Sequence, residues 1–455
     1  MFLDCVFKTQ VYIFYSIKGL KGFQKGFRGM KDFIDVSERP SNAAMLPLSF
    51  QHLFAMFGAT VLVPYLLKAD PATALFMNGI GTILYLFICK GKIPSYLGSS
   101  FAFIAPVLSV MAAGMSYEAA QGGFIAFGLA FIVLSFIVRA VGIGWIDLLF
   151  PPAAMGAIIA VIGLELGPVA MGMAGIVGDS WQTLGMTHTQ VVTLSMFSLI
   201  VTILGTVIFR GFFAVIPVLI GVVSGYVLAA IMGVVDFSKV SEAAWFSLPH
   251  MTTPVFNINA ILMIMPALFV VFAEHVGHLV VTSNIVGRDL MKDPGLERSL
   301  LGDGIANILS GFFGATPNTT YGENIGVLAI TRVFSVYVIG GAAVLAIIFS
   351  FIGKIAALIH AIPVPVMGGV SILLFGIIAA SGLRMLVERK VDYTRPDNLI
   401  LTSIVMITGL SGAQVTLGPV VLQGMGLATV VAVILSLCFA ILRKTGIGNK
   451  QLKHD

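Results

Sequence analysis

Four ionisable residues in apolar sequence could carry chemistry. Glu274, His275 and His278 interrupt an apolar run over residues 262–280, and Glu323 lies in a Gly-, Pro-, Asn- and Thr-rich stretch between other apolar runs. An ionisable group at membrane depth costs at least about 2–3 kcal/mol unless it is paired, protonated or facing a cavity, so it is a functional candidate. Helical spacing predicts that Glu274 and His278 contact each other on one face, with His275 pointing about 100° away.

Glu274 is the first candidate for a proton carrier. The apolar segments contain almost no basic residue that could pair with it. A carboxyl without a cationic partner in a low dielectric favours its protonated form. His278 is then expected to be a hydrogen-bond partner or a proton relay, and His275 to pack or form a structural hydrogen bond.

The stretch around Glu323 predicts a binding site built partly from backbone. Tyr321 and Gly322 precede Glu323, and a helix is expected to begin near Ile325. A helix start offers free N–H donors and positive dipole potential, while Glu274 and Glu323 offer acceptors. This combination suits a small ring with both C=O and N–H groups better than a free anion. Because no nucleophile triad, P-loop or metal cluster occurs, we expect neither an enzyme nor a metal or other cofactor.

The composition defines the class of protein. Of 455 residues, 58% are hydrophobic and 10% are charged, with a mean hydropathy of +1.01. A soluble domain has about 25% charged residues, so the chain is predicted to be a polytopic membrane protein in the lipid bilayer. The net charge of +5 then reflects membrane orientation and indicates no nucleic-acid partner.

Apolar runs near the length needed to cross a bilayer recur along the chain. We predict an all-α fold with fourteen membrane segments at about 46–67, 72–89, 99–115, 119–138, 150–172, 189–209, 212–234, 258–282, 300–314, 316–331, 333–351, 355–381, 397–413 and 421–442. With both termini in the cytoplasm, only Lys68, Lys239 and Lys354 of the 26 Lys and Arg residues fall outside, as the positive-inside rule predicts.

The third and tenth segments are expected to be broken and partly extended. They contain Leu97–Pro106 and Thr316–Gly326, both rich in small and helix-breaking residues. Each is third in its own half of seven, and an odd number of segments per half inverts the second half. Interrupted segments at matching positions of two inverted repeats indicate a transporter's binding site near the bilayer centre. We expect Gln51 and His52 of the first segment to hydrogen-bond to these breaks.

The motifs resemble one transporter family. The run Glu323-Asn324-x-Gly326 followed by Thr331-Arg332, the Gln51-His52 pair and the sequence from Ala273 to His278 are similar to the signatures of the nucleobase–ascorbate (nucleobase–cation symporter 2) family. The amino-acid sequences at 49–58, 150–156 and 316–326 most resemble those of the bacterial uracil permeases in that family. The likeness runs from about Glu38 to the C-terminus.

This resemblance implies a multi-pass protein of the cytoplasmic membrane that imports uracil with protons by alternating access. It implies a core domain (46–138 and 258–351) and a gate domain (150–234 and 355–442) that forms a homodimer. Residues 1–41 are expected to be a basic cytoplasmic leader, whose first 29 residues need not be native, and 443–455 a cytoplasmic tail.

The resemblance also assigns roles to residues. It implies that uracil is bound by Glu274, Glu323, His278 and the backbone of Phe101 and Gly322, with Glu274 and His278 coupling to the proton. A second shell is expected from His52, Gln51, Ser100, Tyr321 and Asn324. Glu at position 323 favours uracil, because purine and xanthine transporters of the family tend to have Gln there. The alternatives are a xanthine or purine proton symporter, and an anion transporter or channel of the same fold.

Overall fold

The computed structural model describes residues 33–210, 213–214, 216–417 and 420–445. Most of the predicted leader and the end of the predicted tail lie outside these residues. The first part of the chain contains α3 (Asn42–Ala55), α4 (Phe57–Leu67), α5 (Pro71–Ile88), β1 (Leu97–Ser99), η1 (Phe101–Phe103), α6 (Ile104–Ala112), α7 (Tyr117–Val141), α8 (Ile146–Leu149), α9 (Pro152–Glu165), α10 (Gly167–Met173), η2 (Ser180–Leu184), α11 (His188–Ile208), α12 (Pro217–Ile231) and α13 (Ser238–Glu242).

The second part follows a similar order. It contains α14 (Ile258–Ile264), α15 (Ala267–Val286), the turn η4 (Met291–Gly295), α16 (Leu296–Phe313), β2 (Asn318–Thr320), α17 (Gly322–Thr331), α18 (Val336–Ser350), α19 (Gly353–His360), α20 (Val364–Glu388), α21 (Pro396–Leu410), β3 (Gln414–Leu417), β4 (Val420–Gln423) and α22 (Gly424–Thr445). Among the described residues, eight helical stretches are long and apolar enough to cross a membrane, and four shorter apolar helices accompany them. The fold is therefore helical and typical of a membrane protein.

The structure differs from the expected all-α class and segment bounds at particular places. Two antiparallel strand pairs, β1–β2 and β3–β4, are present. The predicted segment 355–381 is two helices, α19 and α20, because Pro363 cannot donate a backbone hydrogen bond and so separates them. The predicted segment 421–442 begins as the strand β4, and its helix starts only at Gly424.

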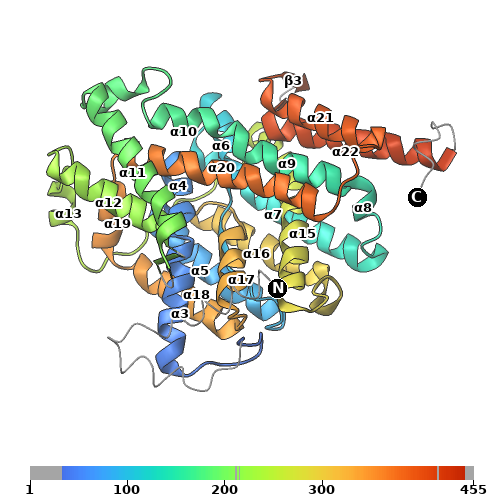
Figure 1. Ribbon diagram of the computed structural model, residues 1–455, viewed down its shortest axis with the longest axis horizontal. Coiled ribbons are helices and arrows are strands. Elements are labelled where there is room, and N and C mark those ends of the chain that lie inside the picture. The colour runs from blue at the N-terminus through green and yellow to red at the C-terminus, as the bar shows by residue number, and fades with distance from the viewer. Residues whose placement is uncertain (1–32, 211–212, 215, 418–419, 446–455) are drawn as a thin grey trace.

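The helices pack in two groups (Figure 1). In the lower part of the view, α16 packs against α5 and α7, and α18 against α3 and α5. In the upper part, α20 packs against α9, α10 and α11, while α21 packs against α9 and α22. Glycines allow this close packing: a Cβ at Gly128 of α7 or Gly304 of α16 would clash with the backbone of the other helix. Small residues serve this purpose widely in membrane helices.

Candidate functional site

The two interrupted segments meet in the strand pair β1–β2. Leu97 pairs with Thr320, and Ser99 with Asn318, in antiparallel register. Two further backbone bonds extend the pair, from Ser100 N to the Pro317 carbonyl (2.8 Å) and from Tyr321 N to the Tyr96 carbonyl (3.0 Å). Both segments are thus partly extended, as the sequence predicts.

A helix follows each strand directly. The strand β1 leads into η1 and α6, and β2 leads into α17. Because the strands are antiparallel, the two helices leave the pair in opposite directions, and both begin beside it. Their first N–H groups have no partner within their own helix and bring positive potential to this region.

Helix α15 brings Glu274 to the strand pair. It packs against η1, β2 and α17. The Oε2 atom of Glu274 is buried and has no hydrogen-bond partner among the described residues. The carboxyls of Glu323 and Asp303 are near enough to interact electrostatically with that of Glu274. An unpaired buried carboxyl oxygen is costly, so Glu274 is placed to be completed by a proton or a ligand.

His278 contacts the second interrupted segment. Its Nδ1 lies 3.1 Å from Thr320 Oγ1. Its Nε2 faces Gly322, where an added Cβ would lie only 3.3 Å away. The sequence predicts a contact between His278 and Glu274, yet within the described residues no hydrogen bond joins them. The hydrogen bond to Thr320 fixes the imidazole against the backbone that begins α17.

The start of α17 is held from two sides. The Tyr321 hydroxyl donates to the carbonyl of Ser99 (2.8 Å), and the Asn324 amide nitrogen lies 3.1 Å from His52 Nδ1. Gly322 is exposed and Glu323 is half-buried. The bond from the Asn324 amide to His52 Nδ1 confirms the predicted hydrogen bond between His52 and an interrupted segment. Gln51 is buried, but its side chain makes no hydrogen bond within the described part of the chain.

Ser100 and Phe101 occupy the corresponding position after β1. Ser100 Oγ is buried without a hydrogen-bond partner in the described chain. The Phe101 ring is 8% exposed and packs edge-on against Phe375 of α20, with ring centroids 5.9 Å apart. This contact places the site where the lower group of helices faces the upper group.

Sequence reasoning missed a buried polar network behind α15. His275 Nε2 lies 2.7 Å from Ser299 Oγ, which is also 2.6 Å from the Tyr85 hydroxyl, and His275 Nδ1 lies 3.2 Å from Asp303 Oδ2. Asn307 continues the network, since its amide donates to the Asn318 carbonyl of β2 (2.9 Å). The expected structural hydrogen bond of His275 is confirmed.

A signal for this network was present in the sequence. Ser299, Asp303 and Asn307 recur at a spacing of four residues, which places them on one face of a helix. All three are fully buried on α16. A third carboxyl at membrane depth, Asp303, therefore accompanies Glu274 and Glu323.

The arrangement is suited to binding a small polar molecule. Within the described residues it combines the unpartnered carboxyl oxygen of Glu274, the carboxyl of Glu323, a histidine and the N-terminal ends of two helices beside one strand pair. No group of three or more potential metal ligands occurs within the described residues. A molecule with both hydrogen-bond donors and acceptors would complement these groups.

Comparison with known proteins gives consistent matches over most of the chain. A family model described as the Permease family, for xanthine and uracil permeases, matches residues 43–418. The uracil permease of Paenibacillus larvae is 58% identical over 422 residues, covering 92% of this chain and 100% of that protein. The uracil permease of Escherichia coli K12 is 60% identical over 409 residues, covering 90% of this chain and 94% of that protein.

Solved structures share the fold at low sequence identity. The transmembrane domain of a cyanobacterial bicarbonate transporter, BicA, superimposes with a TM-score of 0.59 and 15% identity, covering 87% of this chain and 96% of that domain. The murine Solute Carrier 26 family member A9 anion transporter superimposes with a TM-score of 0.67 and 11% identity, covering 95% of this chain and 72% of that one. These likenesses concern the fold alone.

Proposed function

Since the chain belongs to the Permease family of nucleobase–ascorbate transporters, we propose that it imports uracil across the cytoplasmic membrane together with protons. The observation that carries the uracil assignment is the identity of 58% and 60% to two uracil permeases over nearly their whole length. The arrangement of Glu274 and Glu323 beside two helix starts supports it, because uracil has ring N–H donors and C=O acceptors. The protein is a transporter and not an enzyme.

The proposed site binds uracil between carboxyls and backbone. Glu323 accepts ring N–H groups, and the backbone N–H groups of Phe101 and Gly322 donate to the ring carbonyls. Glu274 faces the same ring with its unpartnered oxygen. His52, Gln51, Ser100, Tyr321 and Asn324 form the second shell. The hydrogen bonds of Tyr321 and Asn324 support this role, since they fix the backbone from which Gly322 and Glu323 project.

Glu274 is proposed as the proton carrier, with His278 as its auxiliary. Protonated Glu274 donates a hydrogen bond to uracil, so the loaded site moves across the low-dielectric barrier without an added charge. Loss of the proton on the cytoplasmic side weakens the site and releases uracil. The proton is the coupling ion of this scheme.

The proposed architecture is fourteen segments in two inverted repeats of seven. The occurrence of a strand followed by a helix in both the third and the tenth segment supports it. The lower helix group corresponds to a core domain (46–138 and 258–351). The upper group corresponds to a gate domain (150–234 and 355–442) that forms a homodimer. Alternating access would then move the core against the gate, with both termini in the cytoplasm.

The alternative is a xanthine or purine proton symporter on the same scaffold. Glu at position 323 favours uracil, because purine and xanthine transporters of the family tend to have Gln there. A channel or anion transporter is less consistent with a site whose ionisable side chains are carboxyls and histidines.

The test is uptake of radiolabelled uracil by proteoliposomes under an imposed inward proton gradient. We expect saturable accumulation that an uncoupler abolishes and that unlabelled uracil inhibits more strongly than xanthine. Stronger inhibition by xanthine would favour the alternative substrate. Accumulation that persists after the gradient is collapsed would contradict proton coupling.

A further inference from the structure

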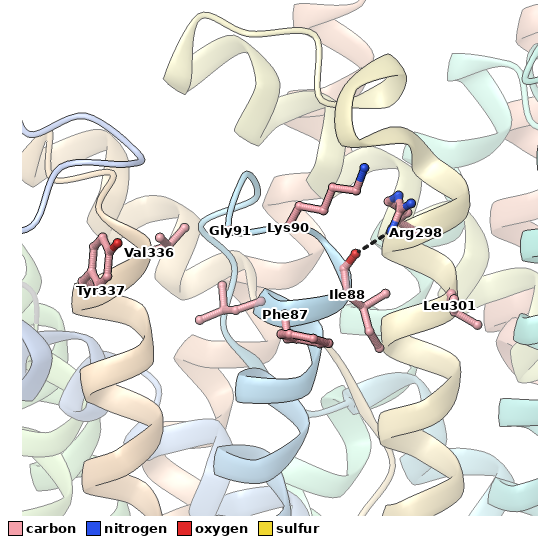
Figure 2. Close-up of a pocket in the computed structure, with 9 residues that line it drawn as sticks. Phe87, Ile88, Lys90, Gly91, Arg298, Leu301, Val336 and Tyr337 are labelled. Atoms are coloured by element: carbon pink, nitrogen blue, oxygen red, sulfur yellow. Dashed lines mark hydrogen bonds between the residues drawn. The ribbon is translucent and has the colours of Figure 1, made fainter.

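An open pocket of about 700 Å³ lies away from the candidate site. It is formed where α5 ends and where α16 and α18 begin (Figure 2). Its lining residues are Leu86, Phe87, Ile88, Lys90, Gly91, Arg298, Leu301, Val336 and Tyr337. Its volume lies in the range of pockets that hold drug-sized ligands, about 300–1,000 Å³.

The charged part of the pocket is positive. Lys90 is exposed, and its side chain makes no ion pair or hydrogen bond within the described residues. Arg298 donates one hydrogen bond, from its guanidinium to the Ile88 carbonyl (3.2 Å), which leaves its other donors available. In Figure 2 the nitrogen atoms of both side chains lie at the upper edge of the pocket.

The carboxylates of the segment around the start of α16 form no ion pair with Lys90 or Arg298 within the described residues. Asp293 pairs with Lys92 at 2.6 Å, and Asp289 pairs with Lys292 at 3.2 Å. The carboxylate of Glu297 lies over Gly295 in the turn that precedes α16. The two cations of the pocket therefore have no acidic partner in the part of the chain that the structure describes, and an anion would complete them.

The rest of the pocket is apolar and open to the surface. Phe87 is 83% exposed and Tyr337 is 47% exposed, although both belong to apolar helices. On a membrane protein such exposure means contact with lipid. Figure 2 places Phe87 and Leu301 below the two cations, so the lining changes from charged to apolar along one direction. Tyrosine is enriched at this depth, where the bilayer core meets the head groups.

We propose that this pocket binds an anionic glycerophospholipid. Lys90 and Arg298 hold the phosphate of the head group, Tyr337 lies beside the ester region, and an acyl chain follows Phe87 and Leu301. Basic pockets between membrane helices on the cytoplasmic side have the chemistry to bind anionic head groups. A purely structural role, in which Arg298 caps the end of α5, explains its hydrogen bond to the Ile88 carbonyl. That role does not explain why Lys90 is unpaired among the described residues or why the aromatic rings are exposed.

The test is titration of the purified full-length protein with phosphatidylglycerol or phosphatidylcholine, with bound lipid counted by native mass spectrometry. The test variant is Lys90→Gln with Arg298→Gln. The control is Lys292→Gln with Arg384→Gln, which removes the same charge from exposed residues that are paired with Asp289 and Glu388. We expect wild type and control to prefer phosphatidylglycerol, and the test variant to bind it about thirtyfold more weakly, at about 1 kcal/mol per basic residue near the surface.

A single variant and a competition with inorganic phosphate complete the test. If the double variant does not fold, Lys90→Gln alone is used, because this side chain has no partner to lose, and a loss of about fivefold is expected from the same electrostatic contribution. Equal binding of phosphatidylglycerol by the test variant and the control would overturn the proposal. Competition by inorganic phosphate as strong as that by the lipid would identify a site for free anions and would equally overturn it.

Discussion

The polar side chains on two faces of the helix α15 differ in the contacts that they make with the rest of the protein. His275, on one face, is fully buried, with a hydrogen bond between Nε2 and Ser299 and with the Asp303 carboxyl 3.2 Å from Nδ1, a charge contact without hydrogen-bond geometry. Within the described residues, Glu274 on the other side has a buried carboxyl oxygen without a partner, and the imidazole of His278 is hydrogen-bonded at Nδ1 alone. A buried polar group whose partners all come from the protein contributes to the fold, whereas one left incomplete is available to a ligand or a proton. The two faces thus separate polar groups that contact the protein from those that we propose bind the substrate and the proton.

The largest effect is expected from Glu274→Gln, because the amide cannot carry and release a proton. This variant should bind uracil but lose all accumulation driven by a proton gradient, while exchange of uracil for uracil continues. Uptake and binding are measured side by side in proteoliposomes. The exposed Glu242→Gln should behave as wild type. If Glu274→Gln still accumulates uracil with protons as the sole driving force, His278 becomes the candidate carrier.

Glu323→Ala should weaken uracil binding about 5- to 150-fold, because it leaves ring N–H groups unpaired at a cost of about 1–3 kcal/mol. Glu323→Gln should lose less affinity or shift the preference towards xanthine. Equilibrium binding of labelled uracil measures both, with Glu242→Ala as the control. An unchanged affinity in a folded Glu323→Ala protein would remove Glu323 from the site.

Ser299→Ala tests the structural face of α15. It removes the hydroxyl shared by Tyr85 and His275 and leaves two buried groups without it. We expect a loss of about 1–3 kcal/mol in the free energy of unfolding, with uracil affinity unchanged. Ser381→Ala is the control, since Ser381 is exposed and bonds only within its own helix. A thermal stability equal to that of the control would show that the network does not stabilise the fold.

The smallest effect, on thermal stability, is expected from a substitution of Asp70. This carboxyl lies outside the spanning helices, and its partners come from the protein. Burial alone would raise the pKa of Asp70, but the His360 imidazole 3.7 Å away and hydrogen bonds from Thr73 and the backbones of His250 and Ala72 lower it to about 2, from an ordinary value of 3.8. Because the folded-state pKa is lowered, its stabilising contribution is present above about pH 4 and is lost as the pH falls towards 2.

Asp70→Asn should therefore be less stable than wild type at pH 6, and this difference in melting temperature should shrink at pH 3. Asp147→Asn, at an exposed aspartate in α8, serves as the control and should show no such change. A difference that is the same at both pH values would mean that the charge of Asp70 does not contribute.

The sequence points to the face of α15 with the proposed site residues more readily than to the face with His275. Glu274 and Glu323 stand out because each is an isolated charge among apolar residues, and the Gly- and Pro-rich stretches around them mark the breaks in the helices. Asp303 is just as isolated, but its neighbours Ser299 and Asn307 are small polar residues common in membrane helices. Only their common face on α16, opposite His275, shows that they form a network.

Other features depend on contacts that sequence cannot specify. Val421 and Leu422 read as part of an apolar segment, yet they lie in the β4 strand of the β3–β4 pair, whose Gln423 donates to Ser109 of α6 (2.7 Å). The partner of His278 is similarly decided by β2, which places Thr320 beside it. Periodicity identifies which residues share a face, but the neighbouring element decides what they contact.

The pairing of β1 with β2 has a consequence for how the protein is made. The hydrogen-bonded residues Ser99 and Tyr321 are 222 positions apart in the chain. At a synthesis rate of about 5–20 residues per second, β1 leaves the ribosome roughly 10–40 s before its partner strand exists. During that interval the backbone groups of Leu97–Ser99 cannot form their final bonds, and a bilayer offers them no water. The first half of the chain must therefore keep this segment hydrated or shielded by protein until the second half arrives, so its membrane insertion and its final folding are separate events.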